Sequence, residues 1–125
     1  MPKGSCLCGA VRFEVEGDFK DPVACHCTRC RKLTGHYDAA TEVAKVSLTI
    51  EGQDNLTWYQ SSGKVRRGFC TTCGAHLLFD PARDWISVAM GAFDAPTGTT
   101  LALHIFVADK GDYYALADGV PQTPQ

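Results

Sequence analysis

The sequence predicts an all-β fold, a single domain of short antiparallel strands over residues 1–125 that bound zinc holds together. Apolar and polar residues alternate over short segments, which is typical of half-buried strands. No segment shows the periodicity of a long amphipathic helix, and all seven cysteines fall into three clusters. A chain of 125 residues that is 45% hydrophobic and 21% charged has the size and composition of one folded domain.

The clearest alternation lies near the N-terminus, where Val11, Phe13 and Val15 alternate with charged residues and predict a strand over residues 9–16. Further strands are expected at residues 38–45, 46–51, 56–60, 67–70, 76–80, 85–90 and 103–108. Turn-rich breaks separate some of them, at residues 52–55 and 61–64. One helical turn is expected over residues 28–33, and a loosely ordered tail after Asp118. We favour the core, rather than a cage around a substrate, as the place of the larger aromatic residues: Phe69, Phe79, Trp85, Phe93 and Phe106.

Composition and charge argue against several classes of protein. No apolar run approaches the roughly 18 residues that a membrane span requires, so no membrane partner is expected. The first residues contain no apolar signal core, and we therefore expect a cytoplasmic protein. The net charge is −2, from 12 basic and 14 acidic side chains, whereas general nucleic-acid binders are usually basic.

The outer cysteines form two pairs with the spacing of metal ligands. Seven cysteines cannot all form internal disulfides, and in a reducing cytosol clustered cysteines favour metal or redox chemistry. Cys6 and Cys8 would point the same way in an extended strand, and Cys70-x2-Cys73-Gly74 has the knuckle spacing of zinc ribbons. Together they offer four thiolates for a closed tetrahedral zinc with bonds of about 2.3 Å. An iron–sulfur cluster and free thiols are the alternatives.

The middle cluster offers three thiolates, on Cys25, Cys27 and Cys30, and no fourth cysteine. Three protein ligands with one open position are typical of a catalytic zinc, which can hold an incoming thiolate or polarise an aldehyde oxygen. His26 would close the site as a fourth ligand, but alternation in an extended chain directs it away from its neighbours. His36 is a further candidate to face the metal, and Cys27-x2-Cys30 could instead be a redox pair.

Basic residues accompany these clusters. Arg29 and Arg31 leave two interpretations open: they offset thiolate charge, or they bind the carboxylates of an anionic thiol such as glutathione. For Arg66 and Arg67 we favour the offset of charge. We interpret His104, in an apolar segment, as a hydrogen-bonded core or sheet residue.

The combined pattern resembles the glutathione-dependent formaldehyde-activating (GFA) family, which includes the centromere-associated CENP-V proteins. The resemblance lies in Gly4-Ser-Cys-Leu-Cys-Gly-Ala-Val-Arg-Phe13, Cys25-His-Cys-Thr-Arg-Cys-Arg-Lys32 and Phe69-Cys-Thr-Thr-Cys-Gly74. His104-Ile-Phe-Val and Asp118-Gly-Val-Pro121 resemble the family's end, so the likeness covers nearly the whole chain.

The resemblance implies a fold of the Mss4-like (β-tent) type and two zinc sites. The structural zinc would be held by Cys6, Cys8, Cys70 and Cys73, and the second, catalytic zinc by Cys25, Cys27 and Cys30. The implied reaction forms S-hydroxymethylglutathione from formaldehyde and glutathione, and is classed as a carbon–sulfur lyase for the reverse step. We therefore expect a small-molecule thiol, with glutathione as cosubstrate, and a small aldehyde as partners.

Two other functions remain as alternatives. A non-enzymatic binding module stapled by zinc needs only the outer quartet of cysteines. A thiol redox or zinc-handling protein would use Cys27 and Cys30, and predicts reversible oxidation with release of zinc.

Overall fold

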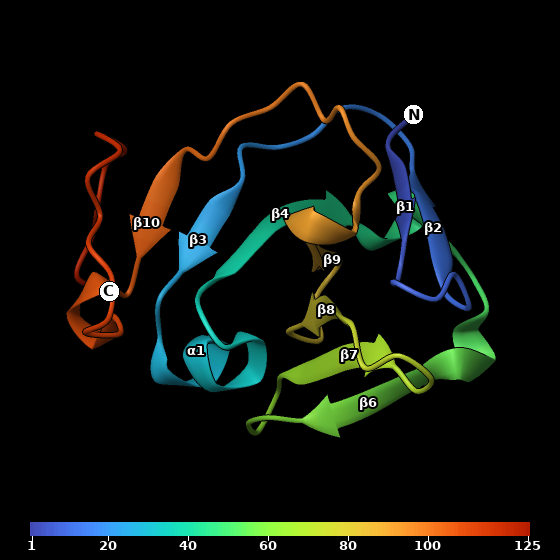
Figure 1. Ribbon diagram of the computed structural model, residues 1–125. Coiled ribbons are helices and arrows are strands. Elements are labelled where there is room, and N and C mark those ends of the chain that lie inside the picture. The colour runs from blue at the N-terminus through green and yellow to red at the C-terminus, as the bar shows by residue number, and fades with distance from the viewer.

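The computed structural model describes residues 1–125 and is built almost entirely of short strands (Figure 1). This confirms the all-β prediction. The strands are β1 (Lys3–Ser5), β2 (Arg12–Val15), β3 (Val23–Cys25), β4 (Asp38–Ala44), β5 (Leu48–Glu51), β6 (Leu56–Gln60), β7 (Arg66–Cys70), β8 (His76–Asp80), β9 (Trp85–Ala89) and β10 (Leu103–Ile105). One α-helix, α1 (Thr28–Thr34), follows β3, and four short 3₁₀ turns complete the structure: Lys45–Ser47, Gln53–Asn55, Met90–Ala92 and Val107–Asp109.

The strands form two sheets. A small antiparallel sheet has the order β1-β2-β5, and a larger one has the order β10-β3-β4-β9-β8-β7-β6. Every pair is antiparallel except β10 and β3, which run parallel. The uniformly antiparallel prediction is wrong at this pair, because most of the chain separates the two strands and no tight turn dictates their direction.

The larger sheet curls, so that β7 and β6 come round below β3 and α1 (Figure 1). The main apolar core includes residues of β2, β4, β7, β8 and β9, among them the fully buried Leu77, Leu78 and Val88. Phe93 packs edge-on against the rings of Phe13 and Phe19, with centroids 5.1 and 4.7 Å away. At the other end of the larger sheet, β3 and β10 border a cavity.

The predicted strands at residues 56–60 and 76–80 match β6 and β8 residue for residue. Five others are shorter than predicted: β2 begins at Arg12, β5 begins at Leu48, β10 ends at Ile105, and β4 and β9 end one residue early, at Ala44 and Ala89. Most of the missing residues lie in turns, namely the cysteine-bearing turn before β2 and the 3₁₀ turns at Lys45–Ser47, Met90–Ala92 and Val107–Asp109. Strands β1 and β3 were not predicted, since three residues are too few to show alternation.

The C-terminal tail is more ordered than the sequence suggests. His104 exchanges backbone hydrogen bonds with Pro121 and Thr123, each of 2.9 Å, and the tail lies beside β10 (Figure 1). The prediction of a loose end is therefore wrong, because the tail pairs with the otherwise bare edge of β10.

Helix α1 is short and has well-defined ends. The Cys27 sulfur accepts the Cys30 N–H at 3.4 Å at its start, and Gly35, with φ +82°, donates to the Arg31 carbonyl at its end. The predicted helical turn at residues 28–33 is confirmed and extends to Thr34. No helix of this chain has the length and apolar character that crossing a membrane would take.

Candidate functional site

The four outer cysteines converge on one point. The Sγ atoms of Cys6 and Cys8 lie 3.6 Å apart, and those of Cys8 and Cys70 lie 3.7 Å apart. With Cys73, all four sulfurs lie within 4.8 Å of one another. A tetrahedral zinc with bonds of about 2.3 Å requires sulfurs about 3.8 Å apart, so this donor set fits zinc. These distances are far too long for disulfides, and all seven cysteines are free.

Two turns, rather than strands, present these sulfurs. Cys6 follows β1, and Cys8 lies in the turn before β2, where Gly9 takes a φ of +81°. The extended conformation expected for this pair is wrong, because residues two apart in a strand are separated by about 6.8 Å. Gly74 has a φ of +76°, as its place after the knuckle predicts.

Backbone N–H groups surround the sulfurs of the quartet. Val11 N–H points to Cys6 Sγ at 3.3 Å, and Cys73 N–H to Cys70 Sγ at 3.5 Å. A hydrogen bond from the Ala75 backbone lowers the pKa of the Cys73 thiol to about 6. The fold therefore stabilises negative charge on sulfur at this position, as a metal ligand needs.

The three middle cysteines also meet, at the start of α1. Their sulfurs lie within 4.8 Å of one another, and Cys30 is buried while Cys25 and Cys27 are half-buried. A hydrogen bond with Cys25 and burial raise the pKa of the Cys30 thiol. Three thiolates this close repel one another unless a positive charge joins them, so the donor set suits a cation. Three sulfurs leave one position of a tetrahedral zinc open.

This cluster opens into a large cavity of about 950 Å³. Its walls come from β3, β4, β7, β8, β10, α1 and neighbouring loops. They include all three middle cysteines, three cations and three carboxylates, together with many apolar side chains. Phe79 and Phe106, which the sequence assigned to the core, both line the cavity. That assignment is wrong for these two rings, because the curl of the sheet leaves space between β8 and β10 rather than closing it. Phe69 and Trp85 are half-buried and lie outside the main core, so the assignment holds only for Phe93.

The basic residues near the cluster take different places. Arg29 lines the cavity beside the cysteines, whereas Arg31 does not. Arg67 is 4% exposed and lines the cavity, with Nη1 3.6 Å from Cys30 Sγ and Nε 3.2 Å from Ser61 Oγ. No carboxylate pairs with Arg67, whereas Arg66, on the same strand, pairs with Asp80 at 3.0 Å. The Arg67 guanidinium is thus a buried cation whose neighbours are sulfur and an open cavity.

His26 faces away from the cluster and belongs to a buried polar network. Its Nδ1 meets the Tyr114 hydroxyl at 2.5 Å, and its Nε2 lies 2.9 Å from Nδ1 of His104. Nε2 of His104 lies 2.9 Å from an Asp118 oxygen. An ionised carboxylate only accepts, so His104 donates to Asp118 and accepts from His26, which in turn accepts from Tyr114. The expected orientation of His26 and the hydrogen-bonded role of His104 are both confirmed.

His36 lies among aromatic residues. Its ring centroid is 4.4 Å from that of Tyr114 and 4.5 Å from that of Tyr37, and it does not line the cavity. The hypothesis that His36 faces the cluster is therefore wrong. Its aromatic neighbours Tyr113 and Tyr114 lie nearly 80 residues further along the chain, which the local sequence could not show.

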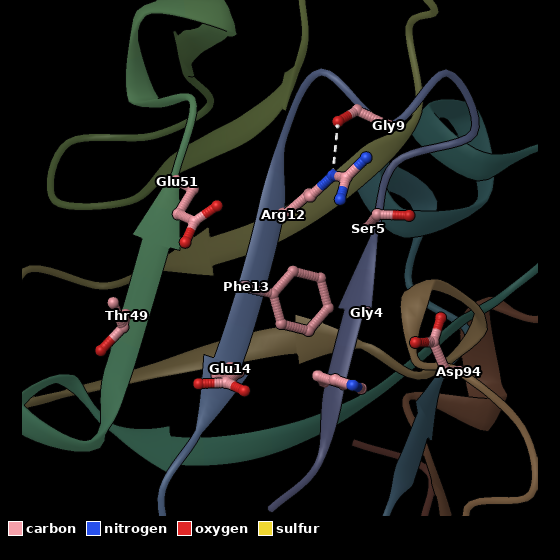
Figure 2. Close-up of a pocket in the computed structure, with 10 residues that line it drawn as sticks. Gly4, Ser5, Gly9, Arg12, Phe13, Glu14, Thr49, Glu51 and Asp94 are labelled. Carbon is pink, nitrogen blue, oxygen red and sulfur yellow. Dashed lines mark hydrogen bonds between the residues drawn. The ribbon is translucent and has the colours of Figure 1, made fainter.

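A second hollow, of about 290 Å³, lies over the small sheet (Figure 2). Its lining is mostly polar, and Arg12 Nε donates to the Gly9 carbonyl at 3.2 Å. The hollow contains no cysteine or histidine, and its charged lining residues are Lys3, Arg12, Glu14, Glu51 and Asp94. Of these two hollows, only the cavity of the middle cysteines is lined by cysteine, and we take it as the candidate site.

Sequence reasoning missed the part that Arg67 plays at this cavity. The residue lies three positions before Cys70, and the sequence gives no sign that its side chain would reach Cys30. A break in register between Gly68 and Phe69 alters the regular alternation of β7. Gly68 was the one available signal, since glycine within a strand often marks such an irregularity.

Comparisons with known proteins agree with this arrangement. A Halomonas elongata protein, described as a "putative glutathione-dependent formaldehyde-activating enzyme", is 34% identical in an alignment of 88 residues that covers 63% of this chain and 56% of that protein. The match thus spans little more than half the length of that relative. A crystal structure of a Rhodobacter sphaeroides protein superposes with a TM-score of 0.64 at 26% identity, covering 97% of this chain and 99% of that one.

The family comparison covers more of the chain. The profile of the glutathione-dependent formaldehyde-activating enzyme family (GFA) matches residues 1–109, which include all seven cysteines. The same cysteines form the two sulfur clusters in space. The match extends over far more than half of the sequence, and the chain belongs to the GFA family.

Proposed function

We propose that this chain catalyses the reversible addition of a thiol to a small aldehyde, as a zinc-dependent carbon–sulfur lyase with glutathione as the thiol. One observation carries the proposal: the sulfurs of Cys25, Cys27 and Cys30 meet at the wall of a cavity, and they leave one metal position open. Membership of the GFA family and the name of the Halomonas relative support glutathione and formaldehyde as the substrates.

The two clusters take different roles in this proposal. Cys6, Cys8, Cys70 and Cys73 supply four ligands and hold a closed structural zinc. Cys25, Cys27 and Cys30 hold the catalytic zinc. When bound there, zinc lowers the pKa of a thiol and polarises a carbonyl oxygen.

The chain's own residues bind and orient the reactants. Arg67 places positive charge beside the Cys30 sulfur, where it offsets the charge of the thiolates. Arg29 and Lys20 line the same cavity and are suited to the two carboxylates of glutathione. Arg31 does not line the cavity, and the proposal gives it no contact with substrate.

The reaction itself needs no oxidant or reductant. The thiol sulfur forms a bond to the carbonyl carbon, the carbon–oxygen π electrons move to oxygen, and the proton lost by the thiol ends on that oxygen. In the reverse direction the hydroxyl proton leaves and the carbon–sulfur bond breaks. A cavity that brings sulfur and carbonyl together lowers the barrier in both directions.

A binding module stapled by zinc is less consistent with this structure. Such a module needs only the outer quartet, and it gives no reason for a second sulfur cluster with a buried arginine at a cavity wall. The redox alternative predicts that mild oxidation joins Cys27 and Cys30 and releases zinc, which thiol counting would detect.

The test measures exchange of ¹³C-formaldehyde with its glutathione adduct by NMR magnetisation transfer. We expect zinc-loaded protein to raise the exchange rate above the spontaneous one, and Cys25→Ser to abolish the increase. The variant should keep one zinc and a cooperative thermal transition, because the outer quartet is unchanged. A spontaneous rate in the presence of protein carrying two zincs would contradict the proposed function.

A further inference from the structure

We propose that the aldehyde part of the substrate carries an apolar group of several carbons, which binds along an apolar row beside Cys25. The inference rests on the proposed function and specifies the substrate of the same cavity. It differs from activation of formaldehyde alone, whose single carbon has no chain to bind.

The apolar row arises because successive side chains of β3 point to opposite faces of the sheet. Ala24 is fully buried and points away from the cavity, whereas Val23 and Cys25 line it. Strand β10 pairs in parallel on one side, and β4 pairs antiparallel on the other. The three strands therefore present rows of side chains to the cavity, one residue from each strand.

The row at the sulfur cluster is mixed. Cys25 has Ile105 beside it on β10 and Asp38 beside it on β4. The next row toward the start of β3 is entirely apolar: Val23, with Leu103 beside it on β10 and Ala40 beside it on β4. Two residues along a strand correspond to about 6.8 Å, so this row lies about that far from the row of Cys25.

Further apolar side chains extend this surface. Phe19, Val65 and Phe79 line the same cavity, and most of its lining residues are hydrophobic. The cavity of about 950 Å³ falls at the upper end of the volumes that hold whole cofactors or drug-sized ligands. Neither the volume nor the apolar row contributes to binding a one-carbon aldehyde.

Phe106 provides a second, independent observation. Its ring lines the cavity and is 37% exposed, and its backbone takes a φ of +55°. This left-handed conformation is unfavourable for an aromatic residue, and such strain is often found at functional positions. The strained backbone holds an exposed aromatic ring at the cavity, where it can cover an apolar chain.

The charged groups of the cavity set the orientation of the ligand. The cysteine cluster marks the part of the cavity where the sulfur of the adduct would lie, and Arg29 and Lys20 are suited to the carboxylates of the thiol partner. The apolar row then remains for the group that the aldehyde contributes. A thiohemiacetal with a short alkyl or aryl group has this division of polar and apolar parts.

The first test measures binding of S-alkylglutathiones, from methyl to hexyl, to zinc-loaded protein by isothermal titration calorimetry. Each methylene that reaches the row should tighten binding about three- to fourfold. Val23→Thr, which keeps the shape of the side chain, should lower the hexyl-to-methyl affinity ratio at least about fourfold. The matched control is Val46→Thr, because Val46 is 94% exposed and does not line the cavity. Ala40→Leu should fill the row and therefore lower the hexyl-to-methyl affinity ratio.

A second series, from ethanethiol to hexanethiol, makes the inference independent of glutathione. If only the alkanethiols bind, and bind more tightly with length, the apolar row is supported and glutathione is removed from the proposed function. If the affinity does not change with chain length in either series, or if neither series binds, the inference is overturned. If the lyase assay fails while the chain-length dependence remains, the proposed function alone is refuted.

Discussion

Replacement of Arg67 by methionine should weaken zinc binding at the middle cysteines and leave the outer quartet unaffected. Its guanidinium Nη1 lies 3.6 Å from the Cys30 sulfur, and the residue is 4% exposed. Methionine retains much of the apolar stem that packs near Phe79, whose ring centroid lies 5.0 Å from the guanidinium carbon. The substitution therefore removes the charge and the donors while changing the packing little.

The magnitude follows from the contacts that are lost. A hydrogen bond to a charged group contributes about 1.5–3 kcal/mol, and residues that support metal ligands typically change metal affinity about 10- to 100-fold. At about 1.4 kcal/mol per tenfold change, these two ranges agree. We expect Arg67→Met to raise the Kd of the second zinc by about 10- to 100-fold.

Competition with a chromophoric zinc chelator would measure both sites, as two phases of zinc release. Arg66→Met is a matched control, because the Arg66 guanidinium carbon lies 3.8 Å from the centroid of the Trp58 ring and its Nε binds Asp80 rather than sulfur. The control should leave both phases unchanged. Equal weakening of both phases by Arg67→Met, or an equal effect of the control, would refute the reasoning.

Three further changes test the fold. Cys70→Ser should abolish the cooperative thermal transition seen by circular dichroism, because Cys70 is fully buried and structural zinc binding is coupled to folding. His104→Phe should lower the free energy of unfolding in urea by about 1–3 kcal/mol, since it leaves His26 without its buried acceptor. Asp80→Asn should cost a similar amount at neutral pH, because Lys45 and Arg66 bind this carboxylate, whose side chain is 4% exposed. Burial raises the pKa of Asp80, but hydrogen bonds from Lys45, Ala82 and Arg66 outweigh burial and lower that pKa. The contribution of Asp80 to the free energy of unfolding is therefore present above the unfolded pKa of about 3.9 and is lost as pH falls through the folded pKa. Urea unfolding of wild type and Asp80→Asn between pH 2 and 7 should therefore converge at the acid end, and a constant difference would contradict the assignment.

Cysteine spacing and strand alternation predicted most of the local structure. The sulfur groups at residues 6, 8, 70 and 73 and at residues 25, 27 and 30 assemble as their spacing suggested. Alternation is clear in β2, whose residues are alternately exposed and buried, and the five-residue strands β6 and β8 were predicted residue for residue. Strand β3, with three residues, does not, although its alternation decides which side chains line the cavity.

Contacts between distant segments were beyond the reach of the sequence. The parallel pairing of β10 with β3 brings Leu103 and Ile105 to the cavity, and nothing local to either strand fixes it. The curl of the sheet and the irregularity at Gly68 bring Arg67 to Cys30. These features depend on how whole sheets pack, whereas spacing and alternation describe single segments.

The buried histidine network explains why the sulfurs face the cavity. A shift of β3 by one residue against β10 would exchange its two faces, burying sulfur and turning His26 toward the cavity. In the observed register His26 finds both His104 and Tyr114, and a shift would leave these buried polar groups without partners. His26, between the two cysteines, thus fixes the register of β3 against β10 and does not serve as a metal ligand. For this reason the Cys-His-Cys order specifies two faces at once, a polar network on one side and a sulfur site on the other.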